Sequence, residues 1–95
     1  MSAEHKNLVG PQVRKIRYQR GMKQKDLAAK LQILGWDIDR VSVSKIEAQL
    51  VWVGDFELFY LAAALRVDVI QLLPPVEPGK AVHADIVKLR INKRK

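Results

Sequence analysis

Residues 24–49 read QKDLAAKLQILGWDIDRVSVSKIEAQ, a stretch that predicts two short helices joined by a turn. Apolar residues recur at helical spacing in both halves: Leu27, Ala28 and Leu31 in the first, and Val43, Ile46 and Leu50 in the second. Each set forms a narrow apolar stripe with polar residues opposite it, which indicates helices rather than strands. The small side chain of Ala28 lets the second helix cross the first closely, as a helix-turn-helix requires.

Local signals mark the ends of both helices. Gly35 suits a left-handed cap after the first helix. Asp39 can cap the second, because its carboxylate can accept from the backbone N–H of Val41 or Ser42. With the apolar stripe turned inward, four residues remain on the outer, N-terminal face of the second helix: Arg40, Val41, Ser44 and Lys45. A recognition helix contacts base edges with this part of its surface.

The stretch resembles the helix-turn-helix of the Cro/cI-type (XRE, lambda repressor-like) DNA-binding domains. Within it the resemblance is carried by Gln24, Leu27, Ala28 and Leu31, and then by Val43, Ser44, Lys45, Ile46 and Glu47. It continues upstream at Gly10, Val13, Ile16, Arg17, Gly21 and Met22, and downstream at Asp55, Leu58, Leu61, Ala62, Leu65 and Val67. The resemblance implies an all-α fold, a five-helix lambda repressor-like bundle followed by a C-terminal extension.

Two features depart from the family's pattern. The turn before the recognition helix is extended, because ILGWD is accommodated there, as in the extended-turn members of the family. Lys23 stands where the family commonly has a Ser or Thr cap, a loss of about 0.5–2 kcal/mol if nothing replaces it.

The resemblance also implies site residues. Arg40 can donate two hydrogen bonds to guanine, Lys45 can contact guanine or a phosphate, and Val41 can pack on a thymine methyl. The expected base contacts are Arg40, Val41, Ser44 and Lys45. The expected phosphate contacts are Lys23, Gln24, Lys25 and Ser42, of which Ser42 has the alternative role of closing its own helix. Arg17 and Glu47 are expected to pair and to join the first helix to the recognition helix.

Composition limits the other classes of function. The chain has 95 residues, enough for one domain. Without cysteine, and with His5 and His83 far apart, no metal site and no cofactor is expected. No pattern of nucleophile, base and carboxylate appears, so we do not expect an enzyme.

Charge favours a polyanionic partner, nucleic acid first and an acidic membrane second. The net charge is +7, and the basic residues concentrate in residues 6–30 and 80–95. No apolar run approaches the ~20 residues that span a bilayer, and the start lacks the core of a signal peptide. We therefore expect a cytoplasmic protein without a membrane segment.

The chain divides into an N-terminal arm (1–8), the DNA-binding domain (9–75), and a linker with a basic tail (76–95) that could dimerise. We expect Asp55–Leu65 to form a helix that is the buried hub of the bundle, with Phe56 and Phe59 inside, and a last short helix over 69–73. The tail pattern fits both a strand and a helix.

Two tryptophans leave alternatives. We expect Trp36 to be anchored in the core rather than to stack on bases. We expect Trp52 to pack beneath the fourth helix, and the alternative is that it is an exposed anchor for a partner. The leading hypothesis is a sequence-specific transcriptional regulator, a repressor that binds a two-fold operator as a homodimer. The alternatives are a protein-interaction module, antitoxin-like or a phage-derived adaptor, that uses the LVWVG loop (50–54) and the tail, and a non-specific nucleic-acid binder.

Overall fold

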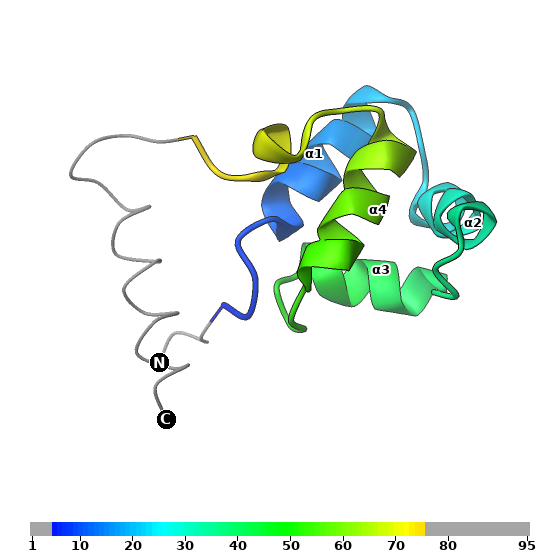
Figure 1. Ribbon diagram of the computed structural model, residues 1–95, viewed down its shortest axis with the longest axis horizontal. Coiled ribbons are helices and arrows are strands. Elements are labelled where there is room, and N and C mark those ends of the chain that lie inside the picture. Colours follow the sequence, from blue (N-terminus) through cyan, green and yellow to red (C-terminus); the bar gives the residue numbers. More distant parts are fainter. Residues whose placement is uncertain (1–4, 76–95) are drawn as a thin grey trace.

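The computed structural model describes residues 5–75 of the chain. These residues form four α-helices and one 3-10 helix (Figure 1): α1 (Gly10–Gln19), α2 (Gln24–Leu34), α3 (Arg40–Glu47), α4 (Asp55–Leu65) and η1 (Val69–Leu72). No strand occurs among residues 5–75. The described part of the chain is therefore all-helical, as the sequence predicts.

The fifth element is shorter than expected. The sequence predicts an α-helix over 69–73, but η1 is a single 3-10 turn that ends at Leu72. Leu73 is already extended, with ψ at 152°, because a residue that precedes a proline avoids the helical conformation. The bundle thus has four α-helices within the described residues rather than five.

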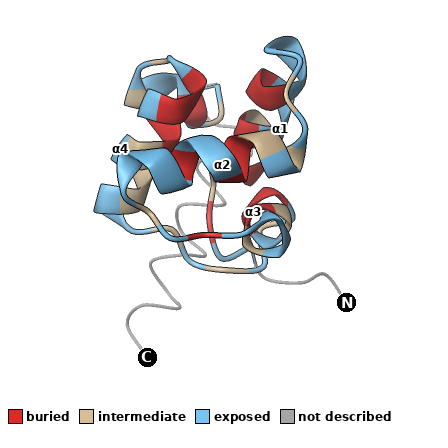
Figure 2. Cartoon of the chain, turned by 90° about the vertical axis from the view of Figure 1, so that its right-hand side faces the viewer, coloured by how far each residue is buried: buried red, intermediate tan, exposed pale blue. Residues whose placement is uncertain are grey.

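The helices pack around one aliphatic core, with buried residues on the inner side of each helix (Figure 2). The predicted stripe of α2 is buried at Leu27, Ala28 and Leu31, and that of α3 at Val43 and Ile46. Leu50, predicted to continue the α3 stripe, is instead exposed, because α3 ends at Glu47 and Leu50 lies in the following loop.

The connection from α2 to α3 is set by local signals. Gly35 ends α2 in the left-handed conformation, with φ at 113°, as predicted. The chain then folds back at Trp36, whose backbone N–H donates to the carbonyl of Leu31 at 2.9 Å. The indole ring packs against the core and against the ring of Tyr60, with the two ring centroids 6.0 Å apart. The prediction that Trp36 is anchored in the core is therefore confirmed. Ile38 is buried just before α3 begins.

Both helix starts in this region have a carboxylate. The Asp39 carboxylate accepts from the Ser42 N–H at 2.8 Å, the cap that the sequence predicts. At α2 the Lys23 side chain cannot accept, but Asp26 accepts from the Lys23 N–H at 2.8 Å. Asp26 supplies the second half of a capping box and offsets part of the cost of Lys23 at the cap.

α1 and α3 cross closely at Gly10. A Cβ on Gly10 would lie 2.8 Å from the Glu47 carbonyl oxygen and closer still to that of Ile46. Just before α1, the buried Asn7 ties the two elements together: its amide donates to the carbonyls of Ile46 at 3.2 Å and Val51 at 2.8 Å, while its side-chain oxygen accepts from the Gly10 N–H. Asn7 falls within the predicted arm, yet it belongs to the packed structure.

α4 is buried on one side only, which corrects the expectation of a buried hub. Leu61, Ala62, Ala64 and Leu65 face the core. Phe56 and Phe59, predicted to be inside, are 79% and 69% exposed. At helical spacing these two rings lie on the face opposite to Leu61 and Leu65, so they cannot reach the same core.

Trp52 also departs from the packing expected of it, since it is 55% exposed. Its neighbours Val51 and Val53 pack against the core instead. Val51 and Val53 are partly buried, and Leu50 and Trp52, which alternate with them along the loop, are exposed. The prediction that Trp52 packs beneath α4 is therefore wrong.

The linker and basic tail, residues 76–95, lie outside the described residues, and so does their predicted strand or helix. The division into arm, domain and tail stays a prediction. Across residues 5–75, no helix combines the length and the apolar character that a membrane crossing needs.

Candidate nucleic-acid interface

α3 presents an outer face that the core does not use. Val43, Ile46 and Glu47 are buried, whereas Arg40, Val41 and Lys45 are exposed and Ser44 is partly so. All four candidate base contacts therefore lie on the accessible side of one short helix. Its N-terminal half, the end that a recognition helix directs at bases, holds two of them, Arg40 and Val41.

A groove runs between this face and the end of α1. It has a volume of about 800 Å³ and is lined from three elements and a loop: α1, the connection to α2, the start of α2, and α3. The cationic residues around it are Arg14, Arg17, Lys23, Lys25 and Arg40. The one acidic residue, Glu47, is paired with Arg17, so the remaining cations give the groove a net positive charge.

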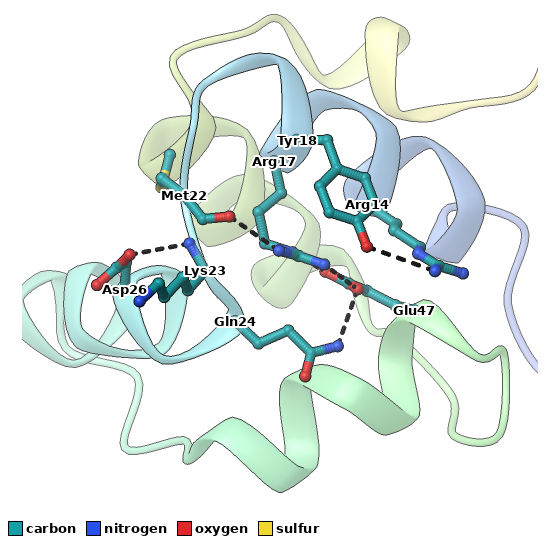
Figure 3. A network of polar contacts seen from close by, with 8 residues as sticks. All are labelled: Arg14, Arg17, Tyr18, Met22, Lys23, Gln24, Asp26 and Glu47. Carbon is teal, nitrogen blue, oxygen red and sulfur yellow. Dashed lines mark hydrogen bonds and ion pairs between the residues drawn. The ribbon is translucent and has the colours of Figure 1, made fainter.

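The Arg17–Glu47 pair is part of the lining of the groove, and Figure 3 shows the hydrogen bonds that it makes. Arg17 Nε and Nη2 donate to the two carboxylate oxygens at 2.7 and 3.0 Å, and Nη1 donates to the Met22 carbonyl at 2.8 Å. The two residues are only 4% and 7% exposed. Bonding to the carboxylate raises the pKa of Arg17 above its ordinary value. The structure thus joins α1 to α3 by the contact that the resemblance implies.

Gln24 extends this network from α2. Its side-chain N–H donates to Glu47 Oε1 at 3.1 Å, so the predicted phosphate contact is also a structural link (Figure 3). Lys23 and Lys25 flank it and are exposed at the rim. The start of α2 therefore brings two ammonium groups and free helical N–H groups to one edge of the groove, an arrangement that suits a phosphate.

Two of the candidate residues lie elsewhere. Ser42 and Lys45 line a smaller cleft of about 300 Å³ on the other side of α3, together with Trp36, Trp52 and Glu57. The Ser42 N–H is taken up by the Asp39 cap, which is the alternative role considered for this residue. The eight predicted contacts are therefore divided. Five line the groove and two line the cleft, whereas Val41 is exposed and lines neither; the groove residues are Lys23, Gln24, Lys25, Arg40 and Ser44.

The site residues predicted from the sequence include neither Tyr18 nor Arg14. Tyr18 is 60% exposed, and its ring lies over the Arg17 guanidinium at 4.7 Å and near that of Arg14 at 5.5 Å. The hydrogen bond from Arg14 lowers the pKa of the Tyr18 hydroxyl. The spacing of Arg14, Arg17 and Tyr18 places them on one helical face, which is the signal that could have found them. Together they add a cation and a hydroxyl to the α1 side of the groove.

No other chemistry is evident in the described region. Among residues 5–75, no three His, Cys, Asp or Glu side chains are arranged to hold a metal ion. What the groove offers is charge, hydrogen-bond donors and one exposed helix face.

The chain is similar in sequence and structure to a protein described as a hypothetical transcription factor, NHTF, from Neisseria. The two are 27% identical, and their structures align with a TM-score of 0.64. The alignment covers 79% of this chain and 83% of the other. No protein-family model matches the chain, and no curated protein matches it.

Proposed function

We propose that this chain is a sequence-specific DNA-binding transcriptional regulator of the Cro/cI type. The observation that carries the proposal is the cationic groove directly beside the exposed face of α3. The likeness to a hypothetical transcription factor supports the same class of function. The net positive charge of the groove attracts a polyanion such as DNA, and no metal-binding cluster lies among the described residues. The exposed face of a short helix can enter the major groove of DNA.

In this proposal the two parts of the interface have different tasks. Lys23, Lys25 and Arg14 hold the phosphate backbone and fix the register of the protein on the duplex. Arg40 and Ser44 then reach base edges from the groove side of α3, and Lys45 reaches them from the cleft side. The buried pair of Arg17 and Glu47 holds α3 at a fixed angle to α1, so that both sets contact one duplex.

The regulator acts as a repressor in this proposal. Two copies bind an operator with two-fold symmetry, and the bound protein excludes polymerase from the promoter. The supporting physical argument is geometric: one α3 reads only a few base pairs, so a second copy is needed for a specific site.

The docking role of the groove can be tested with a fluorescently labelled pool of random duplexes. Affinity is measured by anisotropy over a range of salt concentrations. We expect the plot of log affinity against log salt to become shallower by about two when Lys23 and Lys25 are both changed to Ala, since two phosphate contacts are lost. Lys30→Ala, an exposed lysine of α2 outside the groove, is the matched control and should leave the slope unchanged. Absence of binding by the wild-type chain, or equal slopes for all variants, would contradict the proposal.

A protein-interaction module, antitoxin-like or a phage-derived adaptor, is the second candidate, and one observation favours it. Leu50 and Trp52 of the LVWVG loop are 57% and 55% exposed, so the loop presents two large apolar side chains to a partner. Under this alternative, Trp52→Ala abolishes capture of a protein partner and leaves DNA binding intact. The double variant Arg40→Ala, Lys45→Ala should have the opposite effect under the leading proposal.

A further inference from the structure

The smaller cleft beside α3 is lined by both tryptophans of the chain, Trp36 and Trp52. Trp36 lies in the connection before α3 and Trp52 in the loop after it, and Figure 1 shows these two segments at opposite ends of the helix. The buried Ile46 and the partly buried Val51 complete the apolar lining. Two segments that are far apart along α3 thus bring their indole rings to one space of about 300 Å³.

The charged residues of the cleft differ in the partners that they already have. One oxygen of the Glu57 carboxylate accepts from the Gly54 N–H at 3.0 Å, where it closes the capping box of α4. Lys45 is exposed, and no carboxylate among residues 5–75 pairs with its ammonium group. The cleft therefore combines two aromatic rings with a cation that lacks an acidic partner in the described part of the chain.

We propose that this cleft binds a small aromatic carboxylate, a planar ring system that carries one acid group. The ring packs against the indole rings of Trp36 and Trp52 and against the apolar lining. The carboxylate accepts a charge-assisted hydrogen bond from the Lys45 ammonium group. A volume of about 300 Å³ lies at the lower end of the range for small-molecule pockets, which suits a compound of one or two rings.

Other ligand classes fit this lining less well. A cation would be repelled by Lys45 and would find the Glu57 carboxylate already bound to the Gly54 N–H. Duplex DNA offers phosphates and base edges, but the faces of its bases are covered by their neighbours and cannot pack on indole rings. A free aromatic acid is the class that satisfies both the rings and the ammonium group.

A ligand in the cleft would also change DNA binding, and this step rests on the proposed function. Lys45 is one of the predicted base contacts, so a carboxylate that holds its ammonium group removes that contact from the DNA. Ligand and DNA then compete for one side chain, and each lowers the affinity of the other by the same factor. The aromatic acid thereby releases the protein from its operator.

The ligand site is tested without DNA, by NMR of the full chain labelled with ¹⁵N. Because both tryptophans line the cleft, every indole N–H signal of the chain reports on it. Titration with indole-3-acetate should shift both signals and reach saturation. The dissociation constant should be roughly 1 mM or lower, which a ligand of this size reaches at ordinary efficiency. Failure of either signal to respond would overturn the proposal.

Indole-3-acetamide, which has the same ring but a neutral amide, tests the charge on the unaltered protein. It should bind at least about tenfold more weakly than the acid, because the charge-assisted hydrogen bond is lost. Lys45→Met, which keeps the apolar stem, should weaken binding of the acid by a similar factor. Lys30→Met, at an exposed lysine of α2 outside the cleft, is the matched control and should not. Equal affinities for acid and amide, or an affinity that survives Lys45→Met, would contradict the proposed role of Lys45.

Trp52→Ala tests the contact with the ring. It should weaken binding of indole-3-acetate by at least about fivefold, read from the remaining Trp36 signal, because an aromatic contact is lost. Leu50→Ala is the matched control, since Leu50 is a 57% exposed residue of the same loop that does not line the cleft. Circular dichroism establishes that both variants are folded. Equal affinities of the two variants would show that the indole of Trp52 does not hold the ligand.

A second measurement separates this inference from the proposed function. The anisotropy assay with random duplexes is repeated at saturating indole-3-acetate, with sodium acetate at the same concentration as the control for salt. DNA affinity of the wild type should fall by at least about fivefold, as for coupled sites in general, and that of Lys45→Met should not change. A wild type that binds the acid but keeps its DNA affinity would overturn the competition. A wild type that binds the acid but no DNA would contradict the proposed function and support the ligand site.

Discussion

At the scale of single residues, the central interaction is the buried pair of Arg17 and Glu47. The sequence supports it only through resemblance, because residues 30 positions apart give no local signal of contact. The structure adds what sequence could not supply, the third and fourth partners at Met22 and Gln24. With all these bonds made, each charge is satisfied, and loss of one partner leaves the other charge buried without compensation.

Glu47→Ala should therefore lower the free energy of unfolding by about 3–5 kcal/mol, the usual cost of removing one partner of a buried ion pair. Urea unfolding followed by circular dichroism measures the change. Asp37→Ala, which removes an exposed acid, is the control and should change stability far less. Equal effects of the two substitutions would show that the pair contributes no more than a surface charge.

At the scale of elements, local signals predicted the end of α2 and the start of α3 correctly, but not the ends of α3 and of the last helix. Gly35 and Asp39 fixed the connection from α2 to α3, because a left-handed cap and a carboxylate cap act within a few residues. The sides of α4 could not be predicted, since its apolar residues cover more than one face and only packing selects the buried one. The prediction that Trp52 packs beneath α4 was wrong for the same reason, because Val51 and Val53 take the inward positions instead.

The Asp39 cap should make stability depend on pH. The backbone hydrogen bond from Ser42 lowers the pKa of Asp39 in the folded state. A lowered pKa means that its stabilisation is complete above the unfolded value, about 3.9, and is lost as the pH falls below it toward the folded value. Asp39→Ala should therefore be less stable than the wild type at neutral pH and approach it in acid. Thermal unfolding at several pH values measures this, and a difference independent of pH would exclude the carboxylate as the cause.

The crossing of α1 and α3 gives a second prediction at this scale. Gly→Ala inside a helix normally stabilises, but at Gly10 the added Cβ would meet two backbone carbonyls of α3. We expect Gly10→Ala to destabilise by roughly 1–3 kcal/mol, as overpacking does, because a backbone cannot move aside as a side chain can. Gly54→Ala is the control, since no atom lies within 4 Å of a Cβ there. Chemical denaturation measures the free energy of unfolding of both variants. A Gly10→Ala variant that is more stable than the wild type would contradict the close crossing of α1 and α3.

At the scale of the whole molecule, the sequence predicted an all-helical domain and the order of its helices. It also placed Lys23, Gln24, Lys25, Arg40 and Ser44, which line one groove in the structure. It could not assign Arg14 and Tyr18 to that groove, because their role depends on how α1 lies against α3. Helical spacing alone turns Ser42 and Lys45 away from Arg40 and Ser44. The sequence could not show that these two sides line a groove and a separate cleft, because that depends on which elements pack beside α3.

The central claim is that the exposed face of α3 reads a DNA sequence, and selection from a random duplex library tests it most directly. At about 0.15 M salt, binding through phosphates alone is largely screened. We predict enrichment of an inverted repeat whose half-sites lie about one helical turn apart, and loss of that enrichment in the double variant Arg40→Ala, Lys45→Ala. A wild-type selection that enriches no sequence, or a double variant that enriches the same one, would contradict the claim.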